Sequence, residues 1–149
     1  MNMGEVLKKE RIELSLSAKT KEEALERLCD MLLKSGAIKD KEAFLADVLK
    51  RESISTTGIG NGIAIPHGKS DSVIETTAAL GRLSCPVEWE SVDDKPVEFI
   101  VLLAVSEEDK TGGHIKLLSE MARKLASEEN CKRLLFANSK EEIISVFSE

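Results

Sequence analysis

The longest uninterrupted apolar run of the chain is FIVLLAV at residues 99–105, and it restricts the possible folds strongly. The run falls far short of the roughly 20 residues that a membrane-spanning helix needs. Consecutive apolar residues without alternation are typical of a strand that is covered on both of its faces. Residues 97–106 are therefore predicted to form a buried strand of a sheet.

Helical segments lie towards both ends of the chain. Residues 20–36 carry apolar side chains at helical spacing, with Thr20 and Glu23 placed as a capping box and Gly36 as a stop. Asp40 is placed to cap a second helix over residues 40–52. Three more helices are predicted in the C-terminal part of the chain, over residues 114–127, 130–138 and 139–148.

Three further strands are predicted, over residues 11–16, 62–66 and 76–84. The first alternates, so that Ile12, Leu14 and Leu16 are expected on one face. Helices at both ends and strands through the middle predict an α/β fold, a sandwich with helices on both faces of a mixed β-sheet.

Length and charge set limits on function. The 149 residues are expected to form a single domain, residues 1–149. The net charge of −6 disfavours nucleic-acid binding, and so does an aromatic content of 3%, because base recognition relies on stacking. Residues 1–13 lack the apolar segment of a signal peptide, so a cytoplasmic protein is expected.

The glycine-rich stretch GIGNGIAIPHGKS, residues 58–70, contains Gly-Lys-Ser but does not fit the nucleotide-binding loops. A phosphate loop would need its first glycine at position 63, which is Ile63. Pro66 also lies where backbone N–H groups should face the phosphates, and proline has none. The glycines are spaced GxGxG instead of GxGxxG, so the dinucleotide-binding fingerprint is absent as well.

The same stretch presents one histidine with unusual backbone control. Ile63 and Ile65 can anchor a strand in the core, Pro66 fixes φ before His67, and Gly68 removes side-chain bulk after it. An imidazole with its ordinary pKa of about 6.5 is largely neutral at pH 7, so one ring nitrogen is a nucleophile. His67 is therefore a candidate phosphoryl acceptor, and the alternative is a histidine without function in a surface loop.

Two other chemistries have little support. The chain has only two histidines, His67 and His114, and neither HxH nor HExxH spacing occurs, so no metal site is expected. The cysteines Cys29, Cys85 and Cys131 are scattered without metal-type spacing. A Ser-His-Asp hydrolase would usually show a GxSxG elbow, which is missing.

A known family shares the residues around His67. The run resembles the active-site signature of type 2 enzyme IIA domains, the fructose/mannitol/nitrogen type of the bacterial phosphoenolpyruvate-dependent sugar phosphotransferase system (PTS). The matching residues are Arg51, Ser53, Thr57, Gly58, Ile59, Gly60 and the core IAIPHG at 63–68. The resemblance continues through residues 21–36, 94–106 and 114–125, so it covers the whole chain.

This resemblance implies a fold and a set of roles. It implies a three-layer α/β/α sandwich with a central mixed β-sheet. His67 would accept a phosphoryl group from the carrier protein HPr and pass it to a cysteine of an enzyme IIB, coupled to sugar uptake through the membrane component IIC. Arg51 matches the family's active-site arginine, whose guanidinium would pair with phosphate oxygens.

Other features of the resemblance are less fixed. His114 matches a second histidine that the family often has near the first, and a structural histidine at a helix start is the equal alternative. No metal, nucleotide or other cofactor is implied. Because both partners are proteins, a shallow apolar rim around His67 is expected, with Ile59 and Ile63 as candidates that could instead be core residues.

The chain also departs from a complete transporter. It has no membrane segment, no HPr-like domain and no IIB cysteine motif, since the sequence around Cys85 does not resemble one. A free-standing IIA or one part of a longer polypeptide is expected, with a sugar of the fructose or mannitol class. One alternative is a nitrogen-type regulatory IIA. Another is a passive interaction module of the same fold, although the intact His67 and Arg51 argue against it.

Overall fold

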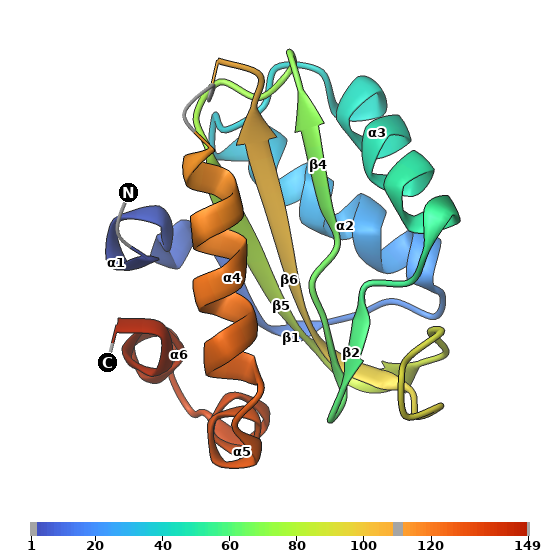
Figure 1. Ribbon diagram of the computed structural model, residues 1–149, viewed down its shortest axis with the longest axis vertical. Coiled ribbons are helices and arrows are strands. Elements are labelled where there is room, and N and C mark those ends of the chain that lie inside the picture. The colour runs from blue at the N-terminus through green and yellow to red at the C-terminus, as the bar shows by residue number, and fades with distance from the viewer. Residues whose placement is uncertain (1–2, 109–111, 149) are drawn as a thin grey trace.

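A mixed six-stranded sheet forms the centre of the molecule (Figure 1). The structure, a computed structural model, describes residues 3–108 and 112–148. The strands are β1 (Ile12–Leu16), β2 (Gly58–Gly60), β3 (Ile63–Ala64), β4 (His67–Ser70), β5 (Thr77–Val87) and β6 (Val97–Ser106). Their order is β1-β5-β6-β3-β2, and β4 also pairs with β6.

Strand β6 organises this sheet. It runs antiparallel to β5 on one side and parallel to both β3 and β4 on the other. Ile63 of β3 pairs with Phe99, and His67 of β4 pairs with Leu103. The two short strands are thus consecutive segments along one edge of β6, separated by residues 65 and 66.

The predicted helices are present, with small changes in their ends. Thr20 and Asp40 cap the first two, because their side chains accept from Glu23 N (3.1 Å) and Ala43 N (3.1 Å). The helices are α1 (Met3–Val6), α2 (Lys21–Lys34), α3 (Lys41–Ile54), α4 (Gly113–Leu125), α5 (Glu128–Phe136) and α6 (Lys140–Ser148), with a 3₁₀ turn η1 (Lys9–Arg11).

Helices cover both faces of the sheet and create two apolar cores. One core, which includes Phe99, Val101 and Leu103, lies under α1, α4, α5 and α6. The other, which includes Ile100 and Leu102, lies under α2 and α3. Alternate residues of β6 therefore point into opposite cores, as the run at 99–105 predicted. The three-layer α/β/α architecture around a mixed sheet is confirmed.

Three details of the predicted strands were wrong. Leu16 does not share a face with Ile12, because the pairing register shifts between Glu13 and Leu16, and Leu16 packs in the core under α2. The strand predicted over residues 62–66 is only Ile63–Ala64, and a further strand, β4, which was not predicted, begins directly after Pro66. Strand β5 extends beyond residue 84 to Val87.

Within the described residues, no helix is both long enough and apolar enough to cross a bilayer.

Candidate functional site

The predicted nucleophile lies where the edge of the sheet is interrupted. Residues 65 and 66 belong to neither β3 nor β4 but keep backbone bonds: Ile65 N donates to Thr57 O (3.0 Å), and Pro66 O accepts from Leu103 N of β6 (2.9 Å). His67 is the first residue of β4 and is half-buried. The sequence prediction of a histidine held at a strand boundary by Pro66 agrees with this backbone.

The His67 ring is oriented by a backbone carbonyl. Its Nδ1 lies 3.0 Å from Ile65 O. A carbonyl oxygen can only accept, so Nδ1 carries the proton of the neutral ring and donates it. Nε2 then holds the lone pair. The local backbone thus determines which ring nitrogen is available as a nucleophile.

Arg51 and His67 line the same cavity, which has a volume of about 270 Å³. Its charged residues are three cations and one carboxylate, an arrangement that favours an anion. The lining residues are Asp47, Lys50, Arg51, Ile54, His67, Gly68 and Lys69. Arg51 Nη1 donates to Ser55 O (2.9 Å), which ties the guanidinium to the end of α3. A guanidinium has five N–H donors, so this bond leaves capacity for phosphate oxygens.

Neither Ile59 nor Ile63, the two residues considered from the sequence, is among the residues that line the His67 cavity. Ile63 is fully buried in the core, and Ile59 is half-buried and packs against the same core. Ile54, which is 74% exposed, lines the His67 cavity instead. The sequence prediction missed it because α3 continues to residue 54, two residues beyond its predicted end.

Gly68 is needed for helix packing. A Cβ at this position would lie 2.9 Å from Val48 Cγ2 and 3.2 Å from Phe44 Cε1, both on α3. The glycine therefore allows α3, which carries Arg51, to pack closely against β4.

We expect Gly68→Ala to destabilise the protein by about 1–3 kcal/mol, because the added methyl overpacks the contact between α3 and β4. Urea unfolding of the purified variant measures this loss. Ala64→Gly, a change of the same size in the neighbouring strand, controls for general sensitivity of the sheet. A Gly68→Ala variant as stable as the wild type would show that α3 can move away without cost.

The turn before β3 depends on an acidic side chain that sequence reasoning missed. Gly60, Asn61 and Gly62 all have positive φ, at 95°, 56° and 80°. Asp93 Oδ2 accepts from Asn61 N (3.0 Å). This bond, together with one from Lys95 N, holds the pKa of Asp93 below its ordinary value. The contact joins positions more than 30 residues apart, so no local pattern could indicate it.

His114 lies in the first turn of α4, after Gly112 with φ of 77°. Gly112 is the N-cap residue of this helix, in a left-handed conformation that glycine adopts without strain. His114 is half-buried and is not one of the residues that line the His67 cavity. The cavity brings together two of the three predicted site residues.

The cysteines are not among the residues that line this cavity. Cys29 on α2 is fully buried, and burial raises the pKa of its thiol to about 12. Cys131 is buried and Cys85 is exposed. In the part of the chain that the structure describes, no group of three or more His, Cys, Asp or Glu side chains could hold a metal ion.

Comparison with known proteins gives consistent matches over the whole chain. The family described as "Phosphoenolpyruvate-dependent sugar phosphotransferase system, EIIA 2" matches residues 5–149. The fructose-specific EIIABC component of Bacillus subtilis is 38% identical over 149 residues; the match covers this whole chain but only 23% of that protein. The fructose-specific EIIA component of Haloferax volcanii is 37% identical, over 94% of this chain and 90% of that protein.

Solved structures give the same result. The nitrogen regulatory protein IIA-Ntr of Neisseria meningitidis has a TM-score of 0.89 and 30% identity, with 97% of each chain covered. The Escherichia coli complex of mannitol enzyme IIA with phosphorylated enzyme IIB matches with a TM-score of 0.80 and 26% identity, covering 95% of this chain and 96% of that one.

Proposed function

The chain belongs to the EIIA 2 family of the phosphoenolpyruvate-dependent sugar phosphotransferase system, and we propose that it carries a phosphoryl group on Nε2 of His67 between two protein partners. The observation that carries this proposal is the bond from Nδ1 to Ile65 O, in a cavity that also contains Arg51. A fixed tautomer and an adjacent guanidinium are what a phosphohistidine relay needs.

The transfer steps follow from this geometry. The Nε2 lone pair attacks phosphorus, the P–N bond to the donor imidazole breaks, and its electron pair returns to the donor ring. The phosphorylated His67 keeps its proton on Nδ1, bonded to Ile65 O. In the second step an acceptor thiolate attacks phosphorus and the electron pair of the P–N bond returns to Nε2. Arg51 would stabilise the equatorial oxygens in both steps.

The partners proposed are phospho-HPr as donor and the cysteine of an enzyme IIB as acceptor. The basic cavity and the exposed Ile54 beside it suit a protein partner that presents a phosphoryl group within an apolar contact. The similarity to fructose-specific proteins and to a IIA found with phosphorylated IIB supports a role in uptake of a sugar of the fructose or mannitol class.

A nitrogen-type regulator is the second candidate. The high structural similarity to the Neisseria meningitidis protein favours it. In that role the same phosphorylation of His67 would control binding to protein partners, without onward transfer to a sugar-specific IIB.

Reconstitution tests the proposal. Incubation of the chain with phosphoenolpyruvate, enzyme I and HPr should add one group of about 80 Da. The label should be lost in acid and kept in base, as for a phosphoramidate. Addition of a fructose-class IIB should then move the label onto cysteine if the role is transport, whereas a regulator would keep it. An unchanged mass in the first step would refute both roles.

His114→Ala is expected to accept phosphate at His67 but to pass it on more slowly. The start of α4 favours anions, and an imidazole there could donate to a phosphoryl oxygen. Stopped-flow measurement of the two half-reactions separates these effects. Wild-type rates in both would make His114 a structural residue. Loss of phosphorylation in a folded variant would mean that the two histidines' roles are reversed.

A further inference from the structure

A buried carboxylate lies behind the candidate site. Glu52 follows Arg51 in the last turn of α3 and is only 8% exposed. Its Oε2 lies 2.7 Å from Lys21 Nζ, an ion pair without a well-aligned hydrogen bond. Its Oε1 accepts from the hydroxyl of Thr57, which is also buried. A charge buried this deeply is costly unless it is paired, so the arrangement is built into the fold.

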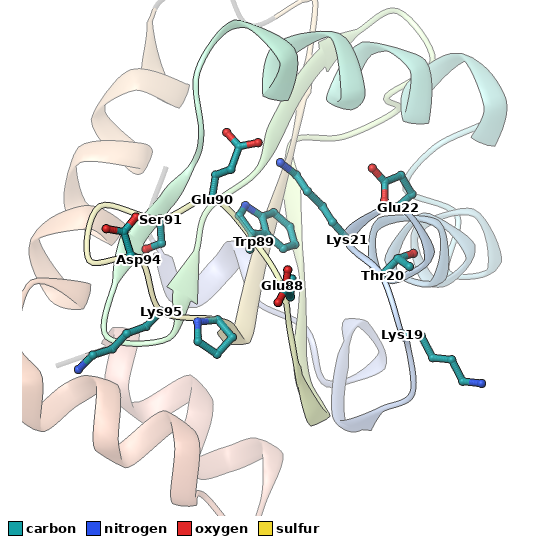
Figure 2. A pocket seen from close by; sticks show the side chains of 11 residues that line it. Lys19, Thr20, Lys21, Glu22, Glu88, Trp89, Glu90, Ser91, Asp94 and Lys95 are labelled. Atoms are coloured by element: carbon teal, nitrogen blue, oxygen red, sulfur yellow. The ribbon is translucent and has the colours of Figure 1, made fainter.

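Lys21 is itself held in place. It is the first residue of α2, and its Nζ lies 4.9 Å from the centroid of the Trp89 ring. Figure 2 shows the Lys21 side chain beside the indole of Trp89, and both residues line a second cavity of about 520 Å³. The ammonium therefore has two partners, a buried carboxylate and an aromatic face, and both fix its position.

From Glu52 a continuous series of contacts leads to the imidazole. Thr57 donates through its hydroxyl to Glu52 and accepts through its carbonyl from Ile65 N (3.0 Å). Ile65 O accepts in turn from His67 Nδ1 (3.0 Å). The carbonyl that determines the His67 tautomer therefore belongs to Ile65, which is bonded directly to Thr57, the residue whose side chain is anchored to Glu52.

We propose that Glu52, held by Lys21 and bonded to Thr57, is a positioning residue for His67: it fixes the Thr57 and Ile65 backbone so that Nδ1 is protonated and Nε2 is available. Only the expected effect on the rate of phosphoryl acceptance rests on the proposed function. The orientation of the ring is a property of the unphosphorylated protein and can be measured alone. Glu52 touches no reacting atom and acts through Thr57 and Ile65.

Threonine variants test this directly, because they leave the buried charge pair intact. Thr57→Val keeps the shape of the side chain and removes the hydroxyl, whereas Thr57→Ser keeps the hydroxyl. Thr77→Val is the matched control, since Thr77 is equally buried but bonds to Val6 O and Arg11. Glu52→Gln is a second variant that removes the charge itself.

The first readout is the tautomer. Long-range ¹H–¹⁵N spectra of histidine-labelled, unphosphorylated protein distinguish the two tautomers of a neutral imidazole. The spectrum of His114→Ala shows which signals belong to His67. The wild type and Thr57→Ser should show His67 protonated on Nδ1. Thr57→Val and Glu52→Gln should show a mixture of the two tautomers, and Thr77→Val should show the wild-type ring.

The second readout is the rate of phosphoryl acceptance from phospho-HPr. Thr57→Val should lower kcat about tenfold with little change in KM, by analogy with the loss of groups that orient metal-binding histidines. Thr57→Ser should restore the rate. A wild-type tautomer in both Thr57→Val and Glu52→Gln, or equal impairment of Thr57→Val and Thr57→Ser, would overturn the inference. If even the wild type accepts no phosphate, the proposed function fails, and the spectra still decide the role of Glu52.

Discussion

His67→Ala is expected to lose phosphorylation completely. Among the described residues, His67 is the only imidazole that lines the cavity shared with Arg51, and its Nε2 is the proposed nucleophile, which the variant lacks. After incubation with phosphoenolpyruvate, enzyme I and HPr, its intact mass should remain that of the unmodified chain, while the wild type gains about 80 Da.

The fold should survive this change. His67 is only half-buried, and its ring makes one bond to the backbone, with Ile65 O. Thermal unfolding of His67→Ala should therefore remain cooperative, which separates loss of chemistry from loss of structure. The matched control is His114→Ala, which should still gain one phosphoryl group. Acid-labile label on His67→Ala would show that another residue is the acceptor.

Arg51 should show the second-largest effect. Replacement by lysine keeps the charge but removes the planar fork that binds two phosphate oxygens at once. Loss of one charge-assisted contact costs about 1.5–3 kcal/mol. If the contact is made in the transition state, transfer from phospho-HPr should slow by roughly 10- to 150-fold. Rapid-quench measurement at saturating donor gives this rate, and Arg51→Ala should be at least as slow.

The neighbouring cation provides the control for Arg51. Lys50 also lines the cavity, and it is exposed. An exposed ion pair has an interaction energy of about 0–1 kcal/mol, so Lys50→Ala should slow transfer by only a few-fold. Equal rates for Lys50→Ala and Arg51→Ala would mean that the cavity supplies only a general positive field. A wild-type rate for Arg51→Ala would remove Arg51 from the site.

Local sequence patterns predicted most of the fold. The capping residues Thr20 and Asp40 begin helices as expected, and residues 97–106 form the predicted strand with alternate side chains in two cores. These features depend on neighbours within a few residues, where propensity and periodicity act. The backbone control of His67 by Pro66 was visible for the same reason.

The errors occur where distant segments determine the structure. His67–Ser70 has no apolar alternation, and it is a strand because β6 offers backbone partners to it. Leu16 lies on the opposite face from the predicted one, because the pairing register between β1 and β5 shifts before it. The pair Lys21–Glu52 and the bond between Asn61 and Asp93 each connect positions about 30 residues apart. Such contacts leave no periodic signal, so only the folded chain reveals them.

The interruption between β3 and β4 also affects whether a second copy of the chain could pair with the edge of the sheet. An exposed strand edge is a template to which another chain can add, and long, regular edges are the ones that aggregate. Here the outer side of β3 is already paired with the short strand β2, and β4 offers only four residues beside α3. Pro66 removes one donor, and Ile65 turns its N–H towards Thr57. The backbone irregularity that orients His67 thus also disfavours strand addition along the β3–β4 edge of the sheet.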